Sequence, residues 1–190
     1  MNAVRDENHR TVDKPGVDEK SPFLAYLGLG SNIEPQKNLP KAVELLEKEL
    51  KIATISTAWV TPAVGSEGPD FINAAIAVCT SLVAETLKDQ VIRKVETRLG
   101  RVRTSDKNAP RTIDIDILIF DDRIVDELIW EEAFLAVPLA ELIPNFCNPE
   151  NGETLAEAAA RLSAATRILP KPEVLPGNRQ STSQASIKHS

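Results

Sequence analysis

Two aspartates, Asp114 and Asp116, occupy alternate positions in the apolar segment 112–120. Because neighbouring side chains of a β-strand point to opposite faces, both carboxylates would lie on one face, about 7 Å apart at ~3.3 Å per residue. Carboxylates so placed repel each other unless they face water, pair with arginines or bind a divalent cation, and hard oxygen ligands suit Mg²⁺. The spacing therefore predicts a magnesium site; the alternative is the exposed polar face of a sheet.

A basic segment precedes these aspartates, although the whole chain has a net charge of −6. Residues 93–111 contain seven basic and two acidic side chains, which leaves a local net charge of +5. Among them are Arg101, Arg103 and Arg111, and a guanidinium group binds phosphate oxygens in a bidentate manner. Magnesium beside arginines is what phosphoryl transfer requires, because charge on the phosphoryl oxygens must be neutralised. The alternative is a solvated helix face that continues into a loop.

The elements that would position these residues are alternating strands and helices. Four segments are apolar or alternate with a period of two, which predicts strands over 23–29, 51–60, 71–80 and 112–120. Apolar side chains at helical spacing predict helices over 36–50 and 84–99. The order βαββαβ is that of the α+β ferredoxin-like fold, an antiparallel sheet with helices on one face. Further helices are predicted over 134–142 and 153–162.

Length and composition indicate one domain, because 190 residues correspond to about one domain of ordinary size. Residues 1–21 and 171–190 are polar and predict disordered tails on either side of a domain over 22–170. No apolar run approaches the ~20 residues that span a bilayer, and the charged start lacks the apolar part of a secretory signal. The net negative charge disfavours a general nucleic-acid binder. We therefore expect a cytoplasmic monomer that binds neither membranes nor nucleic acid.

Four segments together resemble one family of enzymes. The segment from Arg101 through Pro110-Arg111 to Asp114-Ile-Asp116-Ile-Leu is similar to the signature of the 6-hydroxymethyl-7,8-dihydropterin pyrophosphokinases of folate biosynthesis. Segments 26–32, 61–74 and 138–144 resemble the first strand and turn, the pterin-pocket segment and the closing helix of that family, in the same order. The resemblance covers about residues 24–145. The fold of this family agrees with the βαββαβ order predicted from the pattern.

The resemblance implies an ATP-dependent pterin diphosphokinase, which transfers pyrophosphate from MgATP to the hydroxymethyl group of the pterin and leaves AMP. It implies that the two aspartates bind two Mg²⁺ ions, that Arg101, Arg103 and Arg111 neutralise the phosphates, and that the backbone of Ile117 contacts the adenine. A non-catalytic relative that binds a pterin or a partner protein is the alternative, and so is a phosphotransferase for a related heterocycle. A ferredoxin-like RNA binder would need aromatic side chains exposed on the sheet to stack on bases, and the central strands contain few aromatic residues.

The resemblance also implies a pterin pocket, in which Phe71 and Phe134 stack on the ring and Asn73 reads its edge, helped by Thr61 and the backbone of Val64. A flat bicyclic ring favours aromatic faces, and an amide both donates and accepts hydrogen bonds. Taken without the family, the two phenylalanines fit a hydrophobic core equally well.

The segment 121–133 departs from the family. There the family usually has a loop with a histidine and basic residues around ATP, whereas this segment is shorter and the only histidines are His9 and His189, in the predicted tails. Glu132 stands where the family often has an arginine, and Glu131 precedes it. Because acidic side chains repel phosphate, we predict weak nucleotide binding and slow turnover with pterin binding retained.

Overall fold

The computed structural model describes residues 22–62, 68–102 and 110–175, and within them seven strands form one antiparallel sheet. The strands are β1 (Phe23–Ser31), β2 (Lys51–Ile55), β3 (Trp59–Thr61), β4 (Phe71–Thr80), β5 (Asp114–Phe120), β6 (Arg123–Ile124) and β7 (Leu169–Pro170). Their order is β6-β5-β1-β4-β3-β7, and β2 also pairs with β4. The predicted βαββαβ order is confirmed, with β2 and β3 together forming its second strand.

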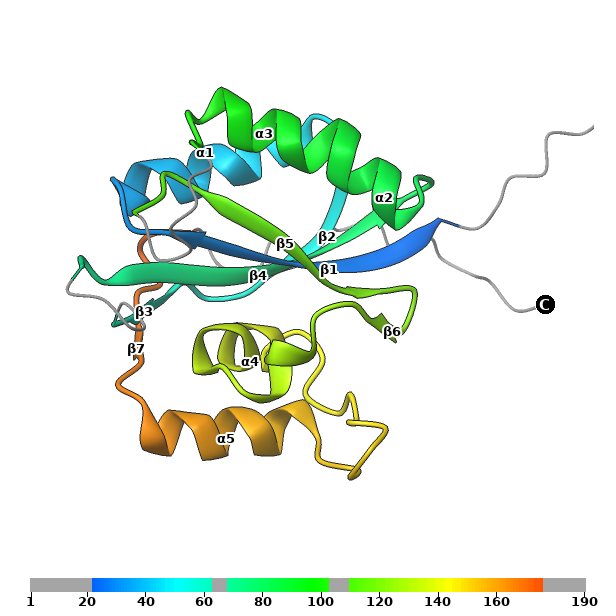
Figure 1. The fold of residues 1–190 in the computed structure, drawn as a ribbon, viewed down its shortest axis with the longest axis vertical. Helices are drawn as coiled ribbons and strands as arrows, with labels where there is room; N and C mark the ends of the chain where they lie inside the picture. The colour runs from blue at the N-terminus through cyan, green and yellow to red at the C-terminus, as the bar shows by residue number, and fades with distance from the viewer. Residues whose placement is uncertain (1–21, 63–67, 103–109, 176–190) are drawn as a thin grey trace, which may run out of the picture.

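Helices cover both faces of this sheet (Figure 1). On one face lie α1 (Pro35–Glu47) and a continuous helical segment made of α2 (Ala84–Leu87), the π-helical turn η1 (Lys88–Ile92) and α3 (Arg93–Arg98). On the other face lie α4 (Ala133–Ala140) and α5 (Leu155–Ala165), preceded by the 3₁₀ turn η2 (Glu127–Trp130). The prediction of helices on one face thus holds for the βαββαβ unit, and α4 and α5 cover the opposite face.

Each face has its own hydrophobic core. Strand β4 shows the division, since Ile76 and Val78 pack under α1 and α3, whereas Ala75 and Ala77 face α4 and α5. The small alanines let α4 approach the sheet closely, because no long side chain stands between them. The sheet is therefore buried on both sides at its centre.

Strand β5 departs from strict alternation. Tyr26 of β1 pairs with Ile119 and Leu27 pairs with Ile117, so Leu118 is an extra residue, a β-bulge. The bulge turns Leu118 and Ile119 both into the core under α4 and α5. Strict alternation over 112–120 would place Ile119 on the face of Ile117, and the bulge places it on the opposite face. Positions 114–117 precede the bulge and keep the predicted alternation.

The predicted strand over 51–60 is interrupted between β2 and β3. There the Thr57 N–H donates to Glu141 Oε2 at 2.8 Å, and the indole N–H of Trp59 donates to Glu141 Oε1 at 2.5 Å. Glu141 directly follows the last residue of α4. This carboxylate therefore fixes the end of α4 to β3.

The folded part of the chain extends past the predicted boundary at residue 170. Val174 and Leu175 are buried, and both belong to the core under α1 and α3. The predicted tail over 1–21 lies outside the described residues, and so do residues 176–190 of the predicted tail over 171–190. Within the residues that the structure describes, no helix combines the length and apolar character that a membrane span needs.

Candidate active site

One end of the sheet contains a cavity of about 280 Å³. At this end β1 and β3 finish and β4 and β5 begin, and the first residues of α4 close the cavity from the side. The lining residues are Gly28, Leu29, Gly30, Thr61, Pro62, Phe71, Asn73, Arg111, Asp114, Asp116, Glu132, Phe134 and Leu135.

Asp114 is held between two arginines. Its Oδ1 accepts a hydrogen bond from Arg101 Nη2 at 3.3 Å, and its Oδ2 accepts one from Arg111 Nη1. The side chains are largely buried, with 13% of Arg101 and 17% of Arg111 exposed. The Arg111 guanidinium also lies 5.6 Å from the centroid of the Phe71 ring, within range of a cation–π contact. Arg111 therefore joins the acidic part of the cavity to its aromatic wall.

Asp116 differs from its neighbour because it makes no hydrogen bond or ion pair with any described residue. Loss of surrounding water raises the pKa of Asp116, and the charge of Asp114 raises it further, while Lys88 acts in the opposite direction. A carboxylate next to a second one, without an arginine of its own, has a strong preference for a cation. This hard oxygen donor set fits Mg²⁺, which binds to one or two carboxylates and completes its coordination with phosphates and water.

A buried amide and two aromatic rings form the other part of the cavity. Asn73 Nδ2 donates to Thr61 Oγ1 at 2.8 Å, and both side chains are buried. A Cβ atom on Gly30 would come within 2.8 Å of Asn73 Oδ1, so a larger residue here would force the Asn73 amide to shift. The rings of Phe71 and Phe134 line the same cavity. This part of the cavity thus combines two aromatic side chains with buried hydrogen-bonding groups.

The turn after β1 fixes the backbone of Arg111. The Arg111 N–H donates to Asn32 Oδ1 at 2.7 Å, and its carbonyl accepts from the N–H groups of Asn32 and Ile33, each at 3.2 Å. The Ser31 hydroxyl donates to the carbonyl of Thr112 at 2.6 Å. Gly28 to Ser31 are thus the last residues of β1, and Ser31 and the following Asn32 position the start of β5.

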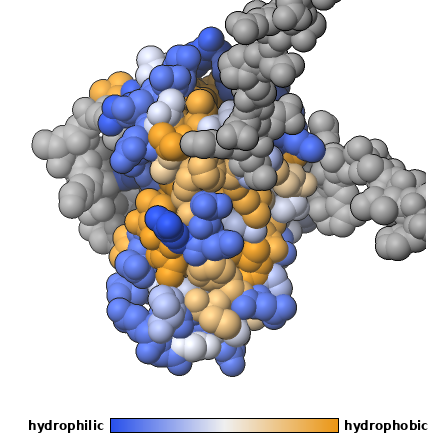
Figure 2. Space-filling view, turned by 90° about the vertical axis from the view of Figure 1, so that its right-hand side faces the viewer, coloured by the Kyte–Doolittle hydropathy of each residue, from blue (hydrophilic) through white to orange (hydrophobic). Residues whose placement is uncertain are grey.

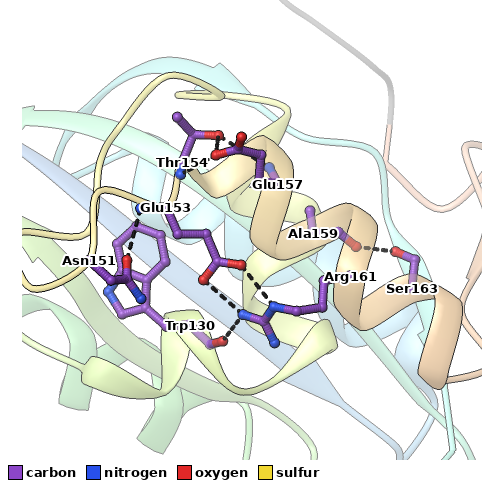
Figure 3. A network of polar contacts seen from close by, with 8 residues as sticks. All are labelled: Trp130, Asn151, Glu153, Thr154, Glu157, Ala159, Arg161 and Ser163. Carbon is purple, nitrogen blue, oxygen red and sulfur yellow. Dashed lines mark hydrogen bonds and ion pairs between the residues drawn. The ribbon is translucent and has the colours of Figure 1, made fainter.

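The segment 121–133 is held in place by a contact with α5 (Figure 3). Arg161 of α5 donates to the carbonyl of Trp130 at 3.0 Å and to Glu153 at 2.8 and 2.9 Å. The Trp130 ring stacks on Phe146 with 6.4 Å between centroids. Glu132, two residues after Trp130, lines the cavity, where burial raises its pKa and the charge of Glu131 raises it further.

The same segment forms part of the molecular surface. On the side where β6 lies, apolar surface runs between polar side chains above and below it (Figure 2). Val125 and Leu128, which follow β6, are among the exposed large apolar side chains. The segment thus covers the core under α4, to which Ile129 and Trp130 belong.

Most predicted site residues meet at this cavity. Seven of them line it: Thr61, Phe71, Asn73, Arg111, Asp114, Asp116 and Phe134. Arg101 reaches it through Asp114, and Ile117 is buried in the core under α1 and α3. Arg103 and Val64 lie outside the described residues.

Sequence reasoning missed several lining residues: Gly28, Leu29, Gly30, Pro62 and Leu135. Gly30 carried a signal, since it is the second glycine of a Gly-x-Gly sequence at the end of an apolar strand. What the signal lacked was the partner, because the close approach to Asn73 depends on the pairing of β1 with β4.

Comparison with known proteins gives a consistent result. Residues 26–144 match the family model of 7,8-dihydro-6-hydroxymethylpterin-pyrophosphokinase (HPPK). The chain is 40% identical over 150 residues to the 2-amino-4-hydroxy-6-hydroxymethyldihydropteridine pyrophosphokinase of Methylorubrum extorquens, covering 73% of this chain and 92% of that protein. The enzyme of the same name from Aquifex aeolicus is 36% identical over 142 residues, covering 70% of this chain and 88% of the relative.

A solved structure shares the fold. The crystal structure of wild-type Plasmodium falciparum HPPK-DHPS matches 77% of this chain and 46% of its own, with a TM-score of 0.61 at 14% sequence identity. The family match spans the strands, the arginines and both aspartates that build the cavity. On these grounds the chain belongs to the 7,8-dihydro-6-hydroxymethylpterin-pyrophosphokinase family.

Proposed function

We propose that this chain transfers the pyrophosphoryl group of ATP to the hydroxymethyl oxygen of 6-hydroxymethyl-7,8-dihydropterin, a step of folate biosynthesis. The observation that carries the proposal is a cavity lined both by an acid–arginine cluster and by a buried amide with two aromatic side chains. The names of the relatives from Methylorubrum extorquens and Aquifex aeolicus support the same reaction. The protein would act in the cytoplasm, where ATP is available, and as a monomer.

On the acidic side, Asp114 and Asp116 would hold two Mg²⁺ ions together with the phosphates of ATP. When bound, Mg²⁺ neutralises charge on the phosphoryl oxygens. Arg101 and Arg111, with Arg103 from outside the described residues, would contact the phosphates, and the Ile117 backbone would contact the adenine. The existing contacts of Asp114 with two arginines support this part, because they gather positive charge where the phosphates would lie.

On the aromatic side, Asn73 would read the hydrogen-bonding edge of the pterin between Phe71 and Phe134, with Thr61 and the backbone of Val64 beside it. The hydroxymethyl oxygen would attack the β-phosphorus of ATP, the bond from that phosphorus to the α-phosphate oxygen would break, and AMP would leave. The hydroxyl proton would pass to water. Catalysis would come from positioning and charge, as in phosphoryl transfer generally.

The test is to incubate the protein with MgATP and the dihydropterin and to separate the nucleotides by chromatography. The proposal expects AMP and a pyrophosphorylated pterin in equal amounts, and neither product without Mg²⁺. Formation of ADP would indicate a different phosphotransferase. Pterin binding without any nucleotide product would indicate a binding protein.

A further inference from the structure

Glu96 of α3 is a buried acid outside the cavity, with 3% of its surface exposed. Its Oε1 accepts a hydrogen bond from the backbone N–H of Ile115 at 3.2 Å. Ile115 is the residue between Asp114 and Asp116. Glu96 therefore contacts the backbone at the centre of the acidic pair.

This contact occurs at the outer edge of β5. Within the described residues, β6 pairs with β5 only at Ile119 and Phe120, so no strand reaches Ile115 from that side. A backbone N–H buried without a partner destabilises a protein, and a carboxylate is a strong acceptor for it. The side chain of Glu96 thus does for this part of β5 what a neighbouring strand does elsewhere.

A second contact joins Glu96 to the arginines. Its backbone carbonyl accepts a hydrogen bond from the N–H of Arg101 at 3.0 Å. The Arg101 side chain in turn donates to Asp114 Oδ1 at 3.3 Å. The four residues Glu96, Ile115, Asp114 and Arg101 therefore form a closed ring of contacts, in which Glu96 holds the backbone on both sides of the arginine–aspartate pair.

A buried carboxylate is costly unless hydrogen bonds compensate for the lost water. Its neighbours on the helical segment, Ile92 and Val95, are apolar and buried, so an apolar residue here would suit the core. The chain nevertheless has an acid at this position, and its side chain accepts from the Ile115 N–H.

We propose that Glu96 is a positioning residue, which sets the distance between Arg101 and the Asp114–Asp116 pair and thereby the affinity of the site for a Mg²⁺–nucleoside triphosphate. The inference rests on the proposed function, because it takes the acidic pair and the arginine as the triphosphate site. Glu96 itself acts through the backbone and does not touch the ligand.

Two conservative variants separate the reach of the side chain from its charge. Glu96→Asp keeps the charge but is one methylene too short for the Ile115 N–H, whereas Glu96→Gln keeps the length and an acceptor oxygen. Titration calorimetry with Mg²⁺ and α,β-methylene-ATP measures nucleotide affinity without turnover. We expect Glu96→Asp to weaken it about tenfold, as for a lost buried hydrogen bond, and Glu96→Gln to change it less than about threefold.

Pterin affinity and a variant at an exposed position serve as controls. Both variants should bind 6-hydroxymethylpterin as the wild type does, since Phe71, Asn73 and Phe134 lie on other elements. Glu85→Asp, at an exposed position of the same helical segment, should change neither affinity. Equal nucleotide affinity of Glu96→Asp and wild type would overturn the inference, and so would a larger loss in Glu96→Gln than in Glu96→Asp. If the wild type bound no Mg²⁺–nucleotide, the proposed function itself would fail.

Discussion

Asp114 and Asp116 lie two residues apart, yet their surroundings give them different tasks. Asp114 is already oriented by Arg101 and Arg111, so its carboxylate is in place before any ligand arrives. Asp116 has no such contact among the described residues, and burial raises its pKa. A preorganised group lowers the reorganisation needed at the moment of reaction. Asp116 is the carboxylate most dependent on a cation.

Replacement of Asp116 should therefore affect activity far more than stability. Asp116→Ala is expected to lower kcat at least about 100-fold and to abolish Mg²⁺-dependent ATP binding, comparable to the loss of one preorganised transition-state contact. The melting temperature should stay the same or rise, because the change removes a repulsive charge next to Asp114. Steady-state kinetics and calorimetry measure both, with Glu47→Ala as a control at an exposed position outside the cavity. Normal turnover would contradict the magnesium assignment.

Arg111→Ala should reduce the rate more than it weakens pterin binding. A phosphate-binding cation acts mainly on charge that develops in the transition state, so we expect kcat to fall about 100-fold with a change in pterin affinity below about threefold. Arg111→Lys restores the charge without the planar fork and should recover only part of the rate. Unchanged turnover with a pure loss of pterin affinity would place Arg111 on the pterin side, through its contact with Phe71.

Gly30 provides a test of the pterin side. A Cβ atom here would lie 2.8 Å from Asn73 Oδ1, so Gly30→Ala must displace the amide from its contact with Thr61. We expect pterin affinity to fall about tenfold, the equivalent of one hydrogen bond to a buried group. Calorimetry with the pterin measures it, and Mg²⁺–nucleotide affinity in the same variant is the control. An unchanged pterin affinity would mean that Asn73 does not read the ring.

At the scale of elements, the turn between β5 and β6 explains the short segment. Asp121 and Asp122 have φ values of 49° and 61°, the left-handed conformation that a tight two-residue hairpin requires. Strand β5 therefore reverses at once into β6, and the chain continues through η2 to Trp130, where Arg161 holds it. No length is left for a loop that could extend over the acidic pair.

The expected consequence is an imbalance between the two ligands. Pterin affinity should be near that of other family members, because the amide and both rings are retained. Mg²⁺–nucleotide affinity should be about tenfold weaker or more, since segment 121–133 is too short to close over the site and Glu132 repels phosphate. Calorimetric titration with each ligand separately, alongside the Aquifex aeolicus relative, measures both affinities. Tight MgATP binding by a chain that ends at residue 175 would show that neither a longer segment nor the residues beyond 175 are needed.

At the scale of the molecule, one sheet separates two hydrophobic cores. The cavity lies at the end of the sheet where β4 and β5 begin. Val174 and Leu175 extend the core under α1 and α3 by adding side chains from far along the chain. Removal of residues 171–190 should lower the free energy of unfolding by about 2–5 kcal/mol, as for large core side chains, while removal of 176–190 should not. Chemical denaturation of both shortened chains measures the difference. Equal stability would show that these two side chains contribute little.

Local pattern predicted the elements well, because strands and helices follow from the spacing of apolar side chains. It could not predict the bulge at Leu118, since the bulge depends on the register between β1 and β5. Helix α4 is apolar all round, so its spacing gave no face and no hint that it covers the second side of the sheet. The apolar pair at 174–175 is too short to form a periodic signal.

The residues of the candidate site were likewise predictable only where they are close together in the sequence. The Asp114–Asp116 spacing and the nearby arginines are visible in one stretch of sequence, and so they could be predicted. Gly30 and Glu96 could not, because each matters through a contact with a strand that lies elsewhere in the sequence. Glu132 was recognised as unusual in sequence, and its place in the cavity wall required the position of α4.

The two tryptophans, Trp59 and Trp130, each lie two residues before a side chain that lines the cavity, Thr61 and Glu132. Trp130 is buried against Phe146, and Trp59 is half-buried with its indole N–H bound to Glu141. Their emission maxima should therefore differ, with that of Trp130 at the shorter wavelength. Because a pterin absorbs light near the wavelengths that tryptophan emits, a pterin in the cavity would quench both by energy transfer. The protein thus carries two intrinsic fluorescent probes, one on each side of its site, and ligand binding can be followed without a label.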